Sequence, residues 1–210
     1  MQTKICGLST PATLDAAIAG GASHVGLVFF AKSPRNLPVD EAASLARRVP
    51  PHVRTVGVFV DPDRAWLDDV RSRVRLDVVQ LHGAETPAFA AAVASDLGGE
   101  VWKAIAVRTR ADLDAARAYR GAAARIVYDA KTPEGTLPGG MGLRFDWQIL
   151  DGVAHPLPWM LSGGLDAGNL RDAVERTRAP MVDVSSGVES APGVKDVAKI
   201  AAFLQVARDL

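Results

Sequence analysis

The sequence predicts an α/β protein folded as a single-domain (β/α)8 barrel, the TIM-barrel architecture, over residues 1–210. Short Val- and Ile-rich runs alternate with longer amphipathic runs along the whole chain, which is typical of parallel strands buried on both faces. Eight such units fit into the chain at about 26 residues each, near the lower size limit for a closed barrel. An open doubly wound sheet, with usually about five or six strands, is the alternative. Eight units without a linker favour the barrel.

The expected strands are short, and several end beside Gly, Asp or His. They cover Thr3–Cys6, His24–Val28, Arg54–Val60, Val78–Leu81, Val101–Ile105, Arg125–Asp129, Trp159–Leu161 and Met181–Val184. Thr10 and Pro11 are suited to open the first helix, and Gly20-Gly21 to close it.

Three of the expected helices are marked by apolar residues at helical spacing. In Ala65–Val74, Asn169–Thr177 and Val197–Leu210 the stripes are Trp66, Leu67, Val70 and Val74, then Leu170, Ala173 and Val174, then Val197, Ile200, Ala201 and Leu204. Asp166 or Asn169 is suited to cap the second of these helices. The stretch 130–142 is the one long irregular loop expected, and such loops are usually functional.

Composition excludes several classes of function. The chain has 24 basic and 24 acidic residues and a pI near 6.9, so we expect no nucleic-acid partner. The longest apolar run, Val25 to Ala31, is far shorter than a membrane helix, so we expect no membrane partner. One cysteine excludes an internal disulfide and fits a reducing compartment. With no signal-like segment at the N-terminus, a cytoplasmic location is expected.

Glycine and serine follow the last two expected strands, as Ser162-Gly163-Gly164 and Ser185-Ser186-Gly187. In (β/α)8 barrels the loops after strands 7 and 8 often bind phosphate, because glycines allow backbone N–H groups to face an anion. Ordinary tight turns are the alternative. We expect Gly163, Gly164, Ser186 and Gly187 to bind a phosphate monoester.

An acid–base pair is predicted across the barrel mouth. Cys6 ends the first strand and shares its side-chain parity with Lys4, whose ammonium group should lower the pKa of the thiol toward neutrality. Asp129 ends the sixth strand, so the two groups can face each other across a ligand, one taking a proton while the other gives one. The alternatives are an inert buried cysteine and an Asp that caps a loop.

Three further polar residues are candidates for the site. Arg35 could clamp a carboxylate through a bidentate contact, or lie solvated in its loop. His82, in Gln80-Leu81-His82-Gly83, could contact substrate or be structural. Asp183 could bind substrate or support the wall through hydrogen bonds. The histidines show no HxxH or HExxH spacing, so no metal is expected.

Taken together, these segments resemble phosphoribosylanthranilate isomerases over essentially the whole chain. The resemblance rests on Lys4-Ile5-Cys6-Gly7-Leu8, Ser33-Pro34-Arg35, Gln80-Leu81-His82-Gly83, Asp129, Gly139-Gly140-Met141-Gly142, Phe145-Asp146-Trp147, Ser162-Gly163-Gly164-Leu165 and Asp183-Val184-Ser185-Ser186-Gly187-Val188-Glu189. Met141 departs from it, because a small hydroxyl residue is expected there.

The resemblance implies a cofactor-free Amadori rearrangement in tryptophan biosynthesis, acting on a phosphorylated aminosugar. It implies Cys6 as general base, Asp129 as general acid, Arg35 near the anthranilate, and the glycine turns as the phosphate loops. We also expect Gly140, His82 and Asp183 among the substrate-binding residues. The partner is then a small molecule, and the protein a monomer or a homodimer.

Other barrels fit less well. A phosphopentose epimerase needs metal ligands at several strand ends, and indole-glycerol-phosphate synthase needs further lysine and glutamate groups at the mouth. Of the six lysines, only Lys4, Lys32, Lys103 and Lys131 are expected in or next to strands, most of them at the wrong end. The dual-specificity sugar isomerase of histidine and tryptophan synthesis uses an aspartate where Cys6 stands. A phosphosugar-binding barrel without catalysis remains open.

Overall fold

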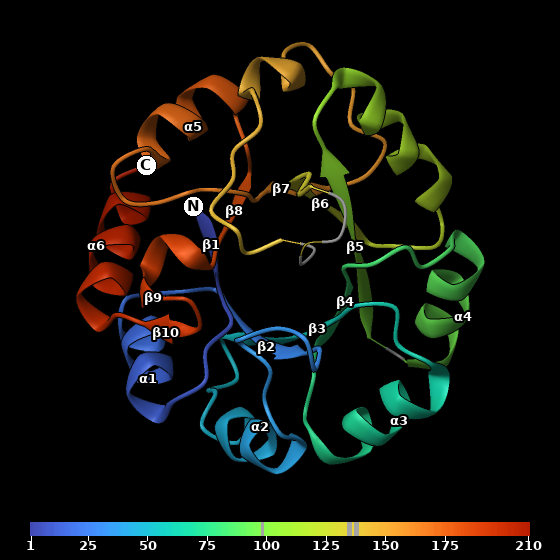
Figure 1. The fold of residues 1–210 in the computed structure, drawn as a ribbon, viewed down its shortest axis with the longest axis vertical. Helices are drawn as coiled ribbons and strands as arrows, with labels where there is room; N and C mark the ends of the chain where they lie inside the picture. The colour runs from blue at the N-terminus through green and yellow to red at the C-terminus, as the bar shows by residue number, and fades with distance from the viewer. Residues whose placement is uncertain (98, 134–135, 137–138) are drawn as a thin grey trace.

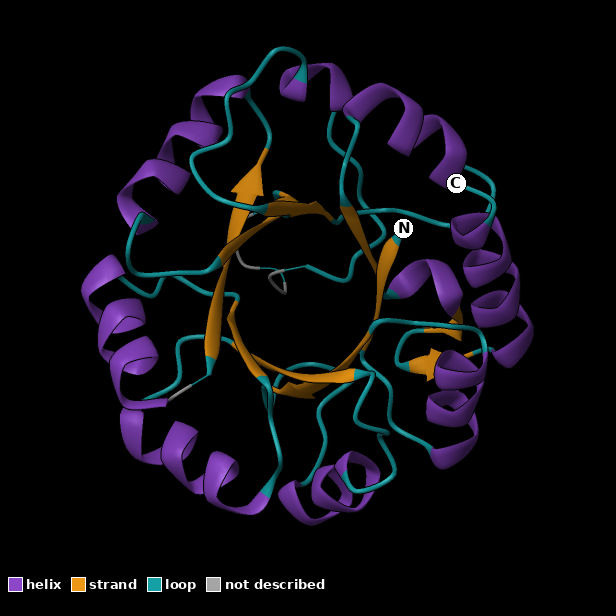
Figure 2. Ribbon diagram, turned by 180° about the vertical axis from the view of Figure 1, so that it is seen from behind, coloured by secondary structure: helices purple, strands orange, loops and turns teal. Residues whose placement is uncertain are grey.

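Eight parallel strands close into a barrel, and neighbours in the barrel follow chain order from β1 to β8. The computed structural model describes residues 1–97, 99–133, 136 and 139–210. Viewed along the barrel, the strands form an inner ring and the helices an outer ring (Figure 1, Figure 2). The strands are β1 Gln2–Cys6, β2 His24–Phe29, β3 Arg54–Phe59, β4 Val78–Leu81, β5 Glu100–Val107, β6 Arg125–Ala130, β7 Trp159–Leu161 and β8 Met181–Val184.

Helices follow the strands and cover the outside of the barrel. The first begins as predicted, because the Thr10 hydroxyl accepts from Thr13 N and Pro11 occupies the first turn. Gly20 caps its C-terminus. The helices are α1 Pro11–Ala19, α2 Val39–Ala46, α3 Arg64–Arg73, α4 Pro87–Leu97, α5 Leu170–Thr177 and α6 Val197–Arg208, with 3-10 helices η1 Arg110–Tyr119, η2 Trp147–Leu150 and η3 Ser186–Val188.

Two predicted helix faces need correction. Trp66 is 39% exposed on α3, and Val197 is 47% exposed at the start of α6. Ala201 is exposed as well, and the buried residues of α6 are Ile200, Phe203, Leu204 and Ala207. Both errors arise at a helix edge, where an apolar residue at the right spacing lies beyond the strip that the barrel covers.

A short antiparallel hairpin between β8 and α6 was not predicted. It consists of β9, Glu189–Ala191, and β10, Val194–Lys195, with Lys195 opposite Glu189. Figure 1 places the hairpin beside α1 and α6, at the edge of the barrel. It brings two charged side chains back to the end of β8.

The barrel interior is apolar in its middle and polar toward the C-terminal ends of the strands. Its apolar layer contains Val28, Val56, Val58, Val78, Trp102, Ala104, Val127, Met160 and Met181, packed with Cys6. Lys4, Gln80, Asp129 and Asp183 are also buried. Lys4 pairs in register with Asp183, so the two side chains share a level of the barrel. Among the described helices, none is long and apolar enough to cross a membrane.

Candidate active site

The Cys6 side chain points into the barrel mouth. It packs with the apolar layer of the interior, and the residue is 7% exposed. Its register partner Gly26 leaves room for the sulfur, since a Cβ there would lie 2.9 Å from Cys6 Sγ. Cys6 and Asp129 line the same cavity. The orientation that the acid–base interpretation requires is therefore present.

The electrostatics of Cys6 differ from the prediction. Burial raises the pKa of the thiol above its ordinary value; Lys4 and Lys195 act to lower this pKa, and Asp183 acts to raise it. The expectation that Lys4 brings the pKa of Cys6 toward neutrality is wrong. The reason is that Lys4 Nζ donates to Asp183 Oδ1 at 2.9 Å, so a carboxylate balances its charge while the thiol loses its water.

Asp183, on β8, forms hydrogen bonds with residues of β1 and of the loop after β7. Its Oδ1 accepts from the fully buried Lys4, and its Oδ2 accepts from Ser162 Oγ at 3.3 Å. Asp183 lines the cavity of Cys6 and a second cavity beside it. The aspartate thus supports the wall, as one of the two predicted alternatives has it.

Asp129 is held in place by two hydrogen bonds. Its Oδ1 accepts from Ala130 N at 2.9 Å, and its Oδ2 lies 3.1 Å from His82 Nε2. On the other side of the imidazole, His82 Nδ1 lies 2.9 Å from Gln80 Nε2. The Nε2 atom of the ring faces Asp129. His82 is therefore placed to orient the acid.

The second cavity is formed by the loops after β6, β7 and β8. Gly163 and Gly164 have φ of +89° and +64°, a left-handed backbone that other residues rarely adopt. Gly187 lies outside the lining, where a Cβ would collide with the Leu165 carbonyl oxygen. The lining consists of residues 139–143, 162–165, Ser185 and Ser186, with Asp129, Ala130, Thr132 and Asp183.

Met141, the departure from the family pattern, is 49% exposed at the rim of this second cavity. The neighbouring Gly140 lines both cavities and offers its carbonyl oxygen to Arg35. Of the predicted loop 130–142, residues 134, 135, 137 and 138 lie outside the described part of the chain.

Arg35 is a buried arginine with most of its hydrogen bonds already made. Its Nε donates to Glu189 Oε1 at 2.7 Å, and its Nη2 donates to Glu189 Oε2 at 2.7 Å and to Gly140 O at 2.9 Å. At 7% exposure it is not a solvated loop residue. Among the described residues, Nη1 has no hydrogen-bond partner, and Arg35 lines the cavity of Cys6. Two of its three guanidinium nitrogens are therefore already engaged within the protein.

The other three histidines lie elsewhere. His24 begins β2 at the opposite end of the barrel, His52 is exposed, and His155 stacks on Trp159 with ring centroids 4.3 Å apart. Within the described residues, no group of three or more His, Cys, Asp or Glu side chains is arranged to hold a metal ion.

Glu189 and Lys195 are site residues that sequence reasoning missed. Lys195 Nζ forms an ion pair with Glu189 Oε1, and its side chain is fully buried. Lys195 was not expected in or next to a strand, but it lies on β10 and its ammonium group contacts Ser185 at the end of β8. A turn at Pro192-Gly193 could have indicated the hairpin, because Pro-Gly pairs mark tight turns.

A barrel with a thiol and a carboxyl group lining one cavity at its mouth, and glycine-rich loops around an adjoining cavity, is organised like an enzyme of the phosphate-binding (β/α)8 class. Comparison with known proteins narrows this class. A family model described as N-(5'-phosphoribosyl)anthranilate (PRA) isomerase matches residues 3–206, and the chain belongs to this family.

Individual relatives agree over the full length. An N-(5'-phosphoribosyl)anthranilate isomerase of Rhodospirillum centenum is 56% identical, with 100% of this chain and 99% of the relative covered. The crystal structure of phosphoribosyl anthranilate isomerase from Thermotoga maritima is 36% identical at a TM-score of 0.90, with both chains fully covered. Another isomerase structure, 34% identical at a TM-score of 0.87 and also fully covered, is a complex with reduced 1-(o-carboxyphenylamino)-1-deoxyribulose 5-phosphate.

Proposed function

We propose that Cys6 and Asp129 carry out the family's reaction in this chain, the conversion of N-(5-phosphoribosyl)anthranilate to 1-(2-carboxyphenylamino)-1-deoxyribulose 5-phosphate. The reaction is an aldose–ketose isomerisation of tryptophan biosynthesis, and chemically it is an Amadori rearrangement. The observation that carries the assignment of the acid and the base is that a buried thiol and a buried carboxylate, far apart in the sequence, line one cavity.

The two groups act in sequence. Protonated Asp129 donates to the ring oxygen of the furanose, which opens the sugar to a protonated Schiff base. The positive nitrogen acidifies the hydrogen on C2′, and the Cys6 thiolate removes it. The enolamine that forms then tautomerises to the ketone, so the sum is an isomerisation. Each positioned proton transfer is worth about 10²–10⁴-fold in rate.

His82 orients the acid in this scheme. The contact between its Nε2 and Asp129 Oδ2, together with the hydrogen bond from Ala130 N to Oδ1, fixes the plane of the carboxyl group. The carboxyl group is thereby held toward the cavity that it shares with Cys6. On the other wall of the cavity, Asp183 accepts hydrogen bonds from Lys4 and Ser162 and so fixes their side chains.

The phosphate of the substrate binds in the second cavity, against Gly163, Gly164 and Ser186, and Gly187 packs the loop behind it. Left-handed glycines turn successive N–H groups toward one point, which suits an anion. The anthranilate carboxylate meets Arg35 Nη1 beside Gly140. The phosphorylated product analogue bound by a structural relative supports a ligand of this size in a similar fold.

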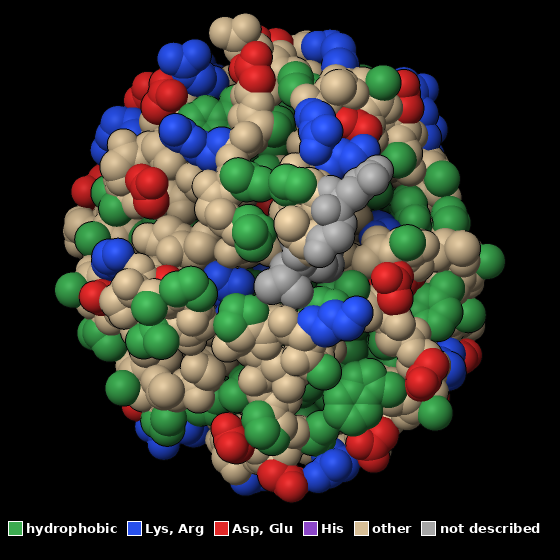
Figure 3. Space-filling view, in the orientation of Figure 1, with side chains coloured by type: hydrophobic (Ala, Val, Ile, Leu, Met, Phe, Trp, Pro, Cys, Tyr) green, Lys and Arg blue, Asp and Glu red, His purple; other side chains and the backbone are tan. Residues whose placement is uncertain are grey.

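The remaining expectations are part of the same proposal. Residues 1–210 form one catalytic domain that acts in the cytoplasm without metal or cofactor, on a small molecule rather than on nucleic acid or membrane. On the face in Figure 3, Lys and Arg side chains are interspersed with Asp and Glu, and no broad patch of one sign forms. The protein is a monomer or a homodimer; a dimeric relative is known from Thermotoga maritima.

Turnover of the purified chain tests the proposal. N-(5-phosphoribosyl)anthranilate is mixed with the protein, and loss of anthranilate-type fluorescence is followed. Turnover that ceases in Cys6→Ser and in Asp129→Asn supports the assignment. Binding without turnover in the unmodified chain favours a phosphosugar-binding barrel without catalysis.

A further inference from the structure

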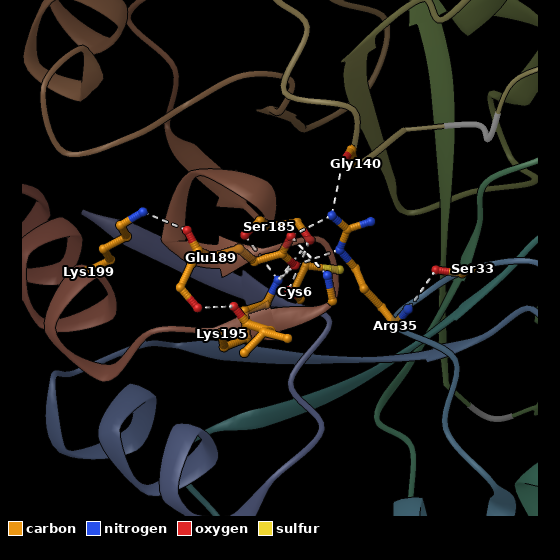
Figure 4. Close-up of polar contacts among 11 residues, drawn as sticks. Cys6, Ser33, Arg35, Gly140, Ser185, Glu189, Lys195 and Lys199 are labelled. Atoms are coloured by element: carbon orange, nitrogen blue, oxygen red, sulfur yellow. Dashed lines mark hydrogen bonds and ion pairs between the residues drawn. The ribbon is translucent and has the colours of Figure 1, made fainter.

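The hairpin after β8 brings two buried charged side chains, those of Glu189 and Lys195, to the side of the barrel mouth on which Cys6 lies. The acid–base scheme above does not use either of them. The side chain of Glu189 is 4% exposed, and that of Lys195 is fully buried. Figure 4 shows Arg35 and Lys195 approaching the Glu189 carboxylate. Burial of charged groups costs desolvation free energy even when they are paired, so the position of this cluster calls for an explanation.

Lys195 is linked to Cys6 through one hydroxyl group. Lys195 Nζ donates to Ser185 O at 3.0 Å and to Ser185 Oγ at 3.2 Å, and it also pairs with Glu189 Oε1. Ser185 Oγ in turn donates to the Cys6 carbonyl oxygen at 3.2 Å. All three ammonium protons thus have acceptors, which fixes the cation beside the start of the Cys6–Gly7 turn.

The buried charged groups around the Cys6 thiol come from several elements of the barrel, and most of them are paired. Lys4 on β1 is balanced by Asp183 on β8. Arg35, from the loop after β2, and Lys195 share the single carboxylate of Glu189.

These five buried charges sum to +1 while Cys6 is a thiol and to zero when it is a thiolate. Two other groups lie farther out. Asp129 and His82 stand on the other wall of the cavity. Lys199 donates to the Glu189 backbone carbonyl at 2.6 Å from an exposed position, where water screens its charge.

We propose that Lys195 is a positioning residue that stabilises the Cys6 thiolate, and that Glu189 holds both Lys195 and Arg35 in the geometry the site needs. The proposal rests on the role of Cys6 as the base. It explains how a base whose burial favours the neutral thiol can still ionise. Removal of the Lys195 charge leaves the surroundings neutral, so that ionisation of Cys6 creates an unbalanced buried charge.

The pKa shifts of the group agree with this arrangement. Burial raises the pKa of Cys6, whereas Lys4 and Lys195 oppose the increase. Burial lowers the pKa of Lys195, whereas Glu189 and Cys6 oppose that decrease. The carboxylate and the thiolate therefore favour the protonated lysine, and the lysine favours the thiolate.

Direct titration of the thiol tests the role of Lys195. Cys6 is the only cysteine, so the ultraviolet absorbance of its thiolate can be followed against pH with Cys6→Ser as the blank. In Lys195→Met we expect the pKa of Cys6 to rise by about one unit or more. Lys195→Arg, the matched control, keeps the charge and the wild-type pKa. If Lys195→Met does not fold, Lys195→Gln, which also lacks the charge but keeps donors for Ser185, replaces it.

An unchanged thiol pKa in the folded Met or Gln variant overturns the proposal. Enzyme kinetics then test the role of Lys195 separately from the role of Cys6 as the base. We expect the acidic limb of the pH profile of kcat/KM to move with the thiol pKa in Lys195→Met, while KM changes little. A thiol pKa that moves without the kinetic limb leaves Lys195 confirmed and removes Cys6 as the base.

Glu189→Gln tests the second half of the proposal. Loss of the carboxylate frees the Arg35 fork, so we expect a rise of about tenfold in KM, because Nη1 is no longer aimed. The expected pKa of Cys6 does not rise in this variant, which distinguishes it from Lys195→Met. A wild-type KM in the folded variant overturns the assignment of Glu189.

Discussion

The two ends of the barrel interior both carry charged residues, but they use them differently. At the N-terminal end, Arg54 pairs with Glu100 at 2.7 Å, and Glu100 accepts from Trp102 Nε1 at 2.9 Å. The guanidinium of Arg125 lies over the Trp102 ring, 5.3 Å from its centroid, and His24 packs against the same ring. These charges cover a fully buried tryptophan and close the barrel.

At the C-terminal end the charges surround a cavity. The ion pairs Lys4–Asp183 and Arg35–Glu189 have side chains at most 7% exposed, against 36% and 41% for Arg54–Glu100. Half-exposed pairs contribute little to stability, and buried pairs cost desolvation. The comparison indicates that the first end stabilises the fold chiefly through burial of Trp102, whereas the second end maintains a reactive site at some expense of stability.

The largest expected effect is loss of activity at the C-terminal end without loss of fold. Cys6→Ser removes the base but keeps its size, so we expect kcat to fall by about 10²–10⁴-fold with a modest change in KM. Steady-state kinetics measure the change, and thermal unfolding serves as the control. Near-normal turnover would remove Cys6 from its role.

Asp129→Asn is expected to have an effect of similar size. The amide keeps the shape of the carboxyl group but cannot donate a proton to the ring oxygen, so kcat should fall by about 10²–10⁴-fold. Asp114→Asn, in which a 74% exposed carboxylate is lost, is the matched control. Equal activity of the two variants would contradict the acid assignment.

At the N-terminal end the expected effect is on stability, through His24. Burial lowers its pKa from 6.5 to about 4, with Arg54, Lys4 and Arg125 adding to the decrease. A depressed histidine pKa means that the unfolded chain takes up the proton first. The free energy of unfolding therefore falls as the pH drops from 6.5 toward 4, by about 3 kcal/mol over the window.

Urea unfolding between pH 7 and 4.5 measures this dependence. His24→Asn should show a shallower loss of stability on acidification than the unmodified chain. His52→Asn, at an exposed histidine, is the matched control and should follow the unmodified chain. Parallel curves for all three proteins would show that His24 does not contribute.

The smallest expected effect concerns the loop after β7, where we propose that the phosphate binds. Gly164→Ala places a Cβ 2.7 Å from the Leu143 carbonyl oxygen at φ +64°, which displaces the loop over the second cavity. We expect KM to rise about tenfold with little change in kcat. Gly152→Ala is the matched control, because Gly152 has the same φ of +64° with no atom within 4 Å of the added Cβ. Equal KM values would argue against phosphate binding there.

Much of the fold could be predicted because its signals are local. Most of the barrel strands are short apolar runs rich in Val or Ile and bounded by turn-forming residues, and the predicted bounds agree with the structure to within about two residues. The hairpin β9–β10 was not predicted, because strands of three and two residues are too short to show a periodic pattern. Trp66 and Val197 were misplaced because helical spacing does not show where the covering surface ends.

The site also has features that could be predicted from local sequence and features that could not. The positions of Cys6 and Asp129 followed from strand parity and from the rule that barrel chemistry lies at the C-terminal ends of strands. The partner of Lys4 could not be predicted, because Asp183 is 179 residues away in the sequence. Arg35 likewise meets Glu189 only through a contact across 154 residues.

The sequence by itself determined the eight strands of the barrel and placed Cys6 and Asp129 at the C-terminal ends of two of them, since these features depend on short-range pattern. Only the tertiary structure decided the ionic state that the site favours. The pKa of a buried thiol depends on the charges around it, and those that act on Cys6 come from Lys4 on β1, Asp183 on β8 and Lys195 on β10, which closure of the barrel brings together.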